Sequence, residues 1–250
     1  MADGTIKSAR RVFEVLEHFD RTRSPLSLRE ICDRFGYPPS SGSGILKSLV
    51  KLGYLEYDRR SRTYLPTMRI AALGSWVATD LFGGLNIIRL MEDLRDSTRE
   101  TVILAAQGDL HAQYVHVIHS TEPLQYAVAP GTLRPLARSG FGRLLLSADP
   151  DLVIEATVRR LDAARTPLEA RIDVRELLIE IQAIRQRGYA VSHNLVTPGV
   201  GIIGVLLPKT PFGRVFALGL GGPSARIEAS RDRHLSLLRG AVDTFAAAPR

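Results

Sequence analysis

Apolar and polar residues alternate between positions 27 and 52 in a way that predicts two short helices joined by a tight turn. Ser27 and Glu30 have the spacing of a capping box at the start of the first helix, and Gly36 is placed to end it. The residues of this helix expected to face a core are Leu28, Ile31, Cys32 and Phe35. This arrangement has the spacing of a helix-turn-helix unit.

The second predicted helix has two faces of different character. Pro38 and Pro39 prevent helix within the turn, so Ser40 or Ser41 is expected to cap the second helix. The apolar face consists of Ile45, Leu46, Leu49, Val50 and Leu52. The opposite face is small and basic and consists of Ser40, Ser43, Gly44, Lys47 and Lys51. Such a face suits a helix lying in a major groove of DNA, although a merely solvated surface is the simpler alternative.

The sequence on both sides of this unit favours the DNA-facing alternative. Upstream, a third helix would complete a small core with an apolar stripe formed by Val12, Val15, Leu16 and Phe19. Downstream, YLEYDRRSRTYLP alternates like a hairpin and breaks at a polar tip formed by Arg59, Arg60, Ser61 and Arg62. Arginines at a loop tip gain little from packing but suit phosphates, because counterion release contributes affinity. The hairpin is therefore predicted to be a wing that contacts DNA.

Residues 68–81, MRIAALGSWVATDL, predict a helix that is apolar on more than one face. Such a helix needs a partner, which could be a second copy of the chain or the chain's own second domain. We interpret it as a linker helix that dimerises, with Trp76 as an anchor of the interface. Gly83 and Gly84 mark a joint before the next helical pattern.

The remaining sequence alternates strand and helix patterns. Strands are predicted for TVILAAQ and LHAQYVHVI, which flank a Gly-Asp turn, and for LQYAVAPG, YAVSHNLV, GIIGVLLP and RVFALGLG. Helices are predicted after Gly140, near 149–161, over 173–188 with a capping box at Asp173 and Glu176, and near 227–245. An antiparallel sheet packed with helices is the economical arrangement, which gives an α+β fold class.

Composition and charge agree with a two-domain DNA-binding protein. The chain has 250 residues and a net charge of +7, and its first 66 residues carry 12 basic and 8 acidic side chains. A single cysteine, Cys32, excludes an internal disulfide and a cysteine-rich zinc site and fits a reducing cytoplasm. No apolar run approaches the roughly 20 residues that span a bilayer, and MADGTIKSARR lacks the apolar core of a signal peptide. A cytoplasmic protein without membrane contact is expected.

Motifs of catalytic and cofactor sites are incomplete. The glycines of residues 199–204 spell GxGxxG, but a proline-ended strand follows where a dinucleotide site needs a helix. Three histidines within residues 111–119 fall on two faces of a strand, which does not suit a metal ion. Ser139 precedes a glycine but has no local base to activate it. We expect no catalytic residue, no metal and no cofactor.

The order and spacing of these segments resemble the IclR family of bacterial transcriptional regulators over nearly the full length. The matching segments are LREICDRFGYPPSS, GYLEYD with TYLP, PGTLRPLARSGFGRLLL, and IRQRGYAVSHN leading to FALGLGGPSARI. The resemblance implies a winged helix-turn-helix at 1–67, a linker and dimerisation helix at 68–82, and a GAF-like effector-binding domain at 83–250. It also implies homodimers, often paired into tetramers, on palindromic operators in double-stranded DNA.

The predicted recognition helix departs from the family pattern. Where many members carry an arginine, this chain has Gly44, flanked by Gly42. An interior glycine costs about 0.5–1 kcal/mol of helix stability. Small residues allow a close approach to DNA but offer few groups that read bases. The expected DNA contacts are Ser40, Ser41, Ser43, Lys47, Arg59, Arg60 and Arg62.

The predicted effector pocket departs as well. Members that sense small carboxylates have an acidic residue after the GYA-type turn and alternating serines on the last strand. The matching positions here are Ser192, Gly219 and Gly221, and Ile202 stands where a small polar or thiol residue would sit. The predicted pocket thus has fewer polar side chains than the pockets of those relatives, and it is expected to have more space for a ligand. Free backbone N–H groups at the helix start near Gly140 are expected to hold a carboxylate.

The effector is therefore predicted to be a small organic acid, aromatic or otherwise less polar than glyoxylate or pyruvate. The candidate effector-binding residues are Gly140, Phe141, Ser192, His193, Ile202, Gly219 and Gly221. Each could instead be an ordinary core or turn position, and His193 could be a solvated residue at a strand end.

The sequence supports two classes of function. The leading one is a ligand-responsive DNA-binding transcriptional regulator. The alternative is a small-molecule enzyme, or a sensor acting through a protein partner, whose basic N-terminal domain serves only for docking. Salt-dependent, sequence-selective binding to duplex DNA would distinguish the first from the second.

Overall fold

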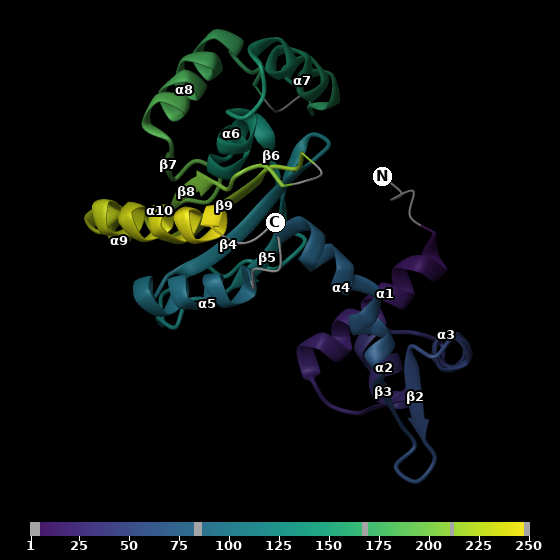
Figure 1. The fold of residues 1–250 in the computed structure, drawn as a ribbon. Coiled ribbons are helices and arrows are strands. Elements are labelled where there is room, and N and C mark those ends of the chain that lie inside the picture. The colour runs from purple at the N-terminus through teal and green to yellow at the C-terminus, as the bar shows by residue number, and fades with distance from the viewer. Residues whose placement is uncertain (1–5, 83–86, 167–169, 211–212, 248–250) are drawn as a thin grey trace. The chain divides into compact units, whose positions relative to one another are not determined.

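The structure is a computed structural model that describes residues 6–82, 87–166, 170–210 and 213–247, without the side chains of residues 76–82. The chain divides into two compact units, Met1–Val77 and Ala78–Arg250, each with its own hydrophobic core (Figure 1). Gly83 and Gly84, expected as a joint, lie outside the described residues, as does the side chain of Trp76.

The Met1–Val77 unit consists of helices around a small antiparallel sheet whose strand order is β1-β3-β2. Its elements are α1 (Lys7–Thr22), β1 (Leu26–Ser27), α2 (Leu28–Phe35), α3 (Pro39–Lys51), β2 (Leu55–Asp58), β3 (Thr63–Pro66) and the start of α4 (Met68–Phe82). The helix-turn-helix is α2 and α3, and the predicted wing is the hairpin of β2 and β3.

The core of this unit is the one that helical periodicity predicts. Val15 and Phe19 of α1 are buried with Ile31 and Cys32 of α2 and Leu46 of α3. The capping box of α2 is confirmed, since the Ser27 hydroxyl accepts from the Glu30 N–H and the Glu30 carboxylate accepts from the Ser27 N–H at 2.7 Å. Gly36 ends α2 in the left-handed region, at φ 64°.

Helix α3 differs from the prediction at both ends. It begins at Pro39, with Pro38 as its N-cap and no side-chain cap, so Ser40 and Ser41 lie inside its first turn. Proline suits the first helical position because its missing N–H would have no partner there anyway. Leu52 follows the helix and is 57 % exposed, so it does not belong to the apolar face.

The Ala78–Arg250 unit is built on an antiparallel sheet with the order β6-β5-β4-β9-β8-β7. Its strands are β4 (Thr101–Gly108), β5 (His111–Ile118), β6 (Leu133–Pro135), β7 (Ala190–His193), β8 (Val200–Leu206) and β9 (Phe216–Pro223). Its helices are α5 (Ile87–Thr98), the short η1 (Leu136–Arg138), α6 (Gly140–Leu146), α7 (Asp151–Ala164), α8 (Val174–Arg187), α9 (Ser224–Ala229) and α10 (Arg231–Ala247). The predicted α+β class is confirmed.

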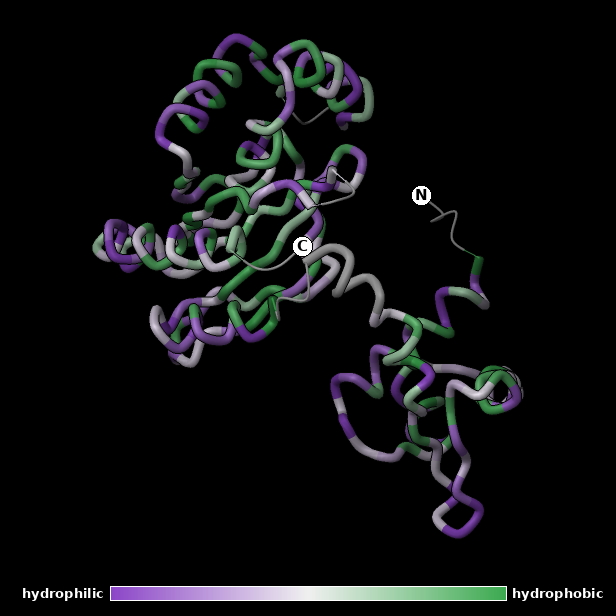
Figure 2. Tube along the Cα trace, viewed as in Figure 1, coloured by the Kyte–Doolittle hydropathy of each residue, from purple (hydrophilic) through white to green (hydrophobic). Residues whose placement is uncertain are grey.

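The sheet of this unit is covered on both faces. Helix α6 packs on one face, with α7 and α8 beyond it, and α5, α9 and α10 pack on the other (Figure 1). The strands in the middle of the unit are largely hydrophobic, as their green colour in Figure 2 shows. The face beneath α6 is the one that matters for the predicted effector site, because Gly219 and Gly221 of β9 lie on it.

Two predicted elements of this unit are wrong. Residues 124–131 do not form a strand: Tyr126 and Val128 are buried in alternation with exposed neighbours, but the segment joins no ladder. Burial on one side creates the alternation, and hydrogen bonds to a neighbouring strand are a separate requirement. The predicted final helix is two helices, because Ser230 leaves the helical conformation and ends α9 before α10 begins.

Candidate DNA-binding and effector sites

The two-faced character of α3 is present in the folded unit. Leu46 and Leu49 are buried in the core at 0 % and 4 % exposure. On the opposite side, Ser40, Gly44 and Lys47 are exposed, whereas Ser41 and Ser43 are half-buried. The predicted contact surface on this helix is therefore open at Ser40, Gly44 and Lys47 and partly covered at Ser41 and Ser43.

The two glycines of α3 have different surroundings. A β-carbon on Gly42 would lie 2.5 Å from Sγ of Cys32 and 3.2 Å from Cδ1 of Leu28. Gly42 is therefore small so that α2 and α3 can cross closely, and the expectation that it shapes the DNA-facing surface is wrong. A β-carbon on Gly44 would have no atom within 4 Å, so this position is open space on the outer face.

The tip of the wing is organised by Asp58. Its carboxylate accepts hydrogen bonds from the Arg60 N–H at 2.8 Å and from the Ser61 hydroxyl at 2.6 Å. These two hydrogen bonds lower the pKa of the Asp58 carboxyl, so the tip keeps its shape near neutral pH. Arg62 takes the left-handed conformation at φ 57°, which closes the turn back into β3.

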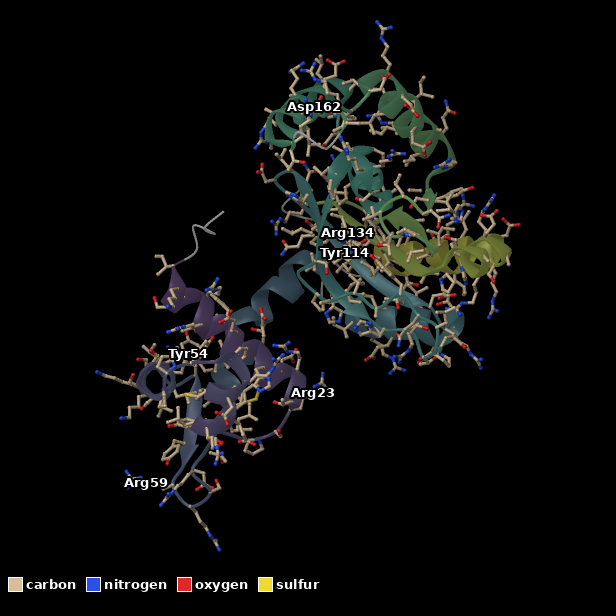
Figure 3. The ribbon with its side chains drawn as sticks, turned by 180° about the vertical axis from the view of Figure 1, so that it is seen from behind. Arg23, Tyr54, Arg59, Tyr114, Arg134 and Asp162 are labelled. Atoms are coloured by element: carbon tan, nitrogen blue, oxygen red, sulfur yellow. The ribbon has the colours of Figure 1, made fainter. Side chains whose placement is uncertain are left out.

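The arginines of the wing tip are available to a partner. Arg59, Arg60 and Arg62 are all exposed, and within the described residues none of the three forms an ion pair. Arg59 is labelled near the tip in Figure 3. Together with Lys47 they offer cations on two elements of one small unit, an arrangement suited to contacting phosphates.

In the Ala78–Arg250 unit, the structure brings most of the predicted effector residues together on the face beneath α6. A β-carbon on Gly140, at the start of α6, would lie 2.5 Å from Oγ of Ser192 and 3.5 Å from Cγ2 of Ile202. Ser192 and Ile202 are direct partners in the pairing of β7 and β8, so their side chains share this face. Gly221 pairs with Ile202 in the same way from β9.

The room expected above the two glycines of β9 is filled by aromatic rings. A β-carbon on Gly219 would overlap the Ile203 carbonyl oxygen and lie 2.7 Å from the Phe141 ring. This ring belongs to a residue that is 1 % exposed, and it also lies 3.0 Å from the β-carbon position of Gly204. The Tyr126 ring lies 2.7 Å from the β-carbon position of Gly221. Glycine at these positions therefore admits the rings, and the prediction of open space is wrong.

One of the backbone N–H groups at the start of α6 already has a hydrogen-bond partner. The Ser139 hydroxyl accepts from the Gly142 N–H at 3.1 Å, so this backbone donor already has a partner. Gly142 itself must be glycine, because a β-carbon would overlap the carbonyl of Leu136. Fewer backbone N–H groups are thus free for an anion than the sequence suggests.

His193 lies apart from the other candidates. It pairs with Gly201 across β7 and β8, one position beyond Ser192, so its side chain lies on the opposite face of the sheet. There its Nε2 approaches Oε2 of Glu228 at 3.1 Å. The structure therefore separates His193 from the cluster around Gly140.

Three residues of the same face were missed at the sequence level: Tyr114, Tyr126 and Arg134. Nη2 of Arg134 donates to the Tyr126 hydroxyl at 3.1 Å, and its guanidinium lies 6.0 Å from the Tyr114 ring centre. The Tyr114 ring in turn meets Phe141 edge to face, with centroids 5.5 Å apart. Figure 3 labels Arg134 and Tyr114 side by side. The inward alternation of Tyr126 and Val128 was the available signal.

Comparison with known protein families matches both units. Residues 8–59 match the IclR helix-turn-helix domain, and residues 85–247 match the C-terminal domain of bacterial IclR transcriptional regulators. The chain belongs to the IclR family. The resemblance seen in the sequence is thus confirmed, and the protein is a DNA-binding transcriptional regulator rather than an enzyme.

Individual relatives agree with this membership. The regulator KdgR of Dickeya chrysanthemi is 25 % identical over 95 % of this chain and 78 % of its own length. An IclR effector domain from Acinetobacter sp. ADP1 is 34 % identical, with a TM-score of 0.62 over 68 % of this chain and 98 % of that domain.

A more distant structure has the same fold with a ligand bound. It is an IclR homologue from Microbacterium hydrocarbonoxydans complexed with 4-hydroxybenzoate, 19 % identical, with a TM-score of 0.61 over 96 % of this chain and 97 % of its own. Within the described part of this IclR-family chain, no helix combines the length and apolar character needed to cross a membrane.

Proposed function

We propose that this IclR-family regulator responds to an organic acid that is aromatic or otherwise less polar than glyoxylate or pyruvate. The observation that carries the proposal is the aromatic lining of the face beneath α6. There Phe141 covers Gly219, Tyr126 covers Gly221 beside Ile202, and Tyr114 packs edge to face on Phe141. Aromatic rings favour the flat apolar surface of another ring. The bound 4-hydroxybenzoate of the Microbacterium homologue is in keeping with an effector of this class.

Calorimetric titration of the full-length protein tests this proposal. Benzoate is expected to bind more tightly than pyruvate or glyoxylate, because its ring gains contact with the aromatic lining and these small acids do not. Tighter binding of pyruvate or glyoxylate than of benzoate would overturn the proposed effector class.

DNA binding is proposed to use the outer face of α3 and the arginine tip of the wing. The residues are Ser40, Ser41, Ser43, Lys47, Arg59, Arg60 and Arg62. Support comes from the exposure of Lys47 and of the tip arginines and from the shape that Asp58 gives the tip. The partner would be an operator in double-stranded DNA, read through phosphates and groove edges.

The double variant Lys47→Ala, Arg60→Ala tests this assignment. Each lost phosphate contact is expected to reduce the slope of log affinity against log salt by about 0.9, so binding to operator DNA should weaken and become less salt-sensitive. Affinity for the effector should stay unchanged. A matched control is Arg29→Ala, Arg159→Ala, which removes the same charge from exposed positions on α2 and α7. If both double variants bind DNA alike, the proposed contact surface is wrong.

We further propose a homodimer, which can pair into tetramers, formed through a linker helix at 68–82 between a DNA-binding domain at 1–67 and an effector domain at 83–250. Met68 and Leu73 of α4 are 82 % and 64 % exposed in the single chain, so apolar surface is available to a second copy. Effector binding would change DNA affinity through its different affinity for two arrangements of the dimer. Sedimentation of the Leu73→Glu variant, expected to favour the monomer, tests the role of this helix.

A further inference from the structure

Arg134 is a cation on the aromatic face of the sheet, and no acidic residue of the described part of the chain pairs with it. It pairs with Ala112 across β5 and β6, so its side chain shares the face of Ala112 and Tyr114 beneath α6. One guanidinium nitrogen, Nη2, donates to the Tyr126 hydroxyl at 3.1 Å. Nε is buried and finds no hydrogen-bond partner among the residues that the structure describes. The group is thus held in place but only partly satisfied.

The lack of an acidic partner distinguishes Arg134 from Arg226, a partly buried arginine of the same unit. On the opposite face, Arg226 donates to both oxygens of the Glu100 carboxylate, which is 1 % exposed. Within the described residues no carboxylate pairs with Arg134. A partly buried charge with neither counter-ion nor full hydrogen bonding is unfavourable, so an incoming anion would be stabilised there.

The hydroxyls around Arg134 can join it in binding an anion. The Tyr126 oxygen accepts from Arg134, and its hydroxyl also interacts with that of Tyr114; a hydroxyl can donate its proton to a carboxylate in place of such a neighbour. Burial lowers the pKa of Arg134, but hydrogen bonds and charge interactions with Tyr126 and Tyr114 outweigh this and raise it. The guanidinium therefore stays charged at neutral pH.

We infer that Arg134 is the anchor for the carboxylate of the effector, with the Tyr126 hydroxyl as a second donor and the rings of Tyr114 and Phe141 as the wall for its apolar body. This inference rests on the proposed function, because it assigns the charged end of the same organic acid. The Tyr126 ring fills the space above Gly221, and Tyr126 lies in the segment between β5 and β6 that joins no ladder. A ligand entering here must therefore shift this ring while its hydroxyl stays near Arg134.

The test compares an acid with its uncharged analogue. Full-length protein is titrated calorimetrically with benzoate and with benzamide, which have the same ring and differ in the charged group. In the wild type, benzoate should bind more tightly. Arg134→Gln should weaken benzoate binding at least about tenfold, the usual scale for a lost charge-assisted hydrogen bond, and leave benzamide binding unchanged. Arg134→Lys keeps the charge but loses the planar fork and should fall between the two.

Two further variants keep the result interpretable. Arg159→Gln removes the same charge from the exposed side of α7 and should bind both ligands as the wild type does. Tyr126→Phe removes only a hydroxyl, so it should fold normally and still weaken benzoate binding several-fold, even if Arg134→Gln proves unstable.

The outcomes separate the two proposals. If benzoate binds the wild type and binds Arg134→Gln, Arg134→Lys and Tyr126→Phe equally well, Arg134 is not the anchor, while the proposed effector class stands. If neither benzoate nor any other aromatic acid binds the wild type, the proposed effector class fails and the inference fails with it. Selective loss of acid binding in the Arg134 and Tyr126 variants supports both.

Discussion

Glycine has opposite roles in the two units: it leaves a helix surface open in one and allows close packing in the other. In α3, Gly44 has no atom within 4 Å of its β-carbon position and leaves an outer face open. In β9, Gly219 and Gly221 are covered by Phe141 and Tyr126, so the same residue type closes a core. The DNA contacts proposed for the N-terminal unit therefore lie on its surface, whereas the effector site proposed for the C-terminal unit lies beneath α6. Whether the space beside a glycine is open or filled therefore depends on neighbours that the sequence alone does not identify.

Phe141→Ala gives the largest expected effect and tests how firmly the C-terminal face is closed. The ring is 1 % exposed and packs over Gly204 and Gly219, so its removal should leave a cavity and lower the free energy of unfolding of this unit by about 3–5 kcal/mol. Denaturant unfolding followed by circular dichroism measures the loss. A loss below about 1 kcal/mol would show that the face is loosely packed. Phe13→Ala, at an exposed position, is the control.

Gly42→Leu and Gly44→Ala form a pair that tests the different roles of the α3 glycines. A leucine side chain at position 42 would overlap Cys32 and Leu28, and overpacking should destabilise the N-terminal unit by about 1–3 kcal/mol and impair DNA binding. An alanine methyl group at position 44 would enter open space, and the change should stabilise the helix by about 0.5–1 kcal/mol. Thermal unfolding of both variants measures the difference. Equal stability of the two would remove the proposed role of Gly42 in helix crossing.

The smallest expected effect concerns His234 of α10, which is 3 % exposed and whose buried Nδ1 has no hydrogen-bond partner among the described residues. Burial lowers the pKa of His234 below its ordinary 6.5; nearby Glu100 opposes this, and Arg233 and Arg226 add to it. The unfolded chain then takes up a proton below pH 6.5 that the folded chain does not, so stability present above pH 6.5 is lost as the pH falls.

Melting temperatures at pH 7.5 and pH 5.5 check this dependence. The wild type should melt at a lower temperature at pH 5.5, and His234→Gln should show a smaller difference because glutamine does not titrate. His18 of α1 shifts in the same direction, mainly by burial, so His18→Gln reports the contribution of the N-terminal unit. An unchanged pH difference in His234→Gln would show that His234 does not contribute.

Much of the N-terminal unit could be predicted from the sequence because the interactions that define its helices and hairpin are local. The capping box at Ser27 and Glu30, the end of α2 at Gly36 and the apolar stripe around Val15 all depend on residues within a few positions of one another. The wing is predicted by alternation interrupted by polar residues. The serine cap of α3 was mispredicted because proline at position 39 already begins the helix.

The sheet face beneath α6 was harder to predict because the residues that pack together there come from parts of the chain far apart in sequence. Phe141 meets Gly204 and Gly219, and Tyr126 meets Gly221, only through the order β4-β9-β8 and its register. A shift of one residue in that register would place each side chain on the other face. Ser192 and His193 lie on opposite faces by strand alternation alone, and the tertiary structure decides only which of the two lies on the side of α6.

Periodicity, short motifs and their order were enough to predict the helix-turn-helix, the wing hairpin, the α+β class and the family. The packing role of Gly42, the aromatic rings over the β9 glycines, and the contact of Arg134 with Tyr126 without an acidic partner among the described residues emerged from the folded chain. The difference lies in the range of the interactions. Helices and turns are fixed by neighbours along the chain, whereas the environment of a buried charge is fixed by whichever strands the sheet places beside it.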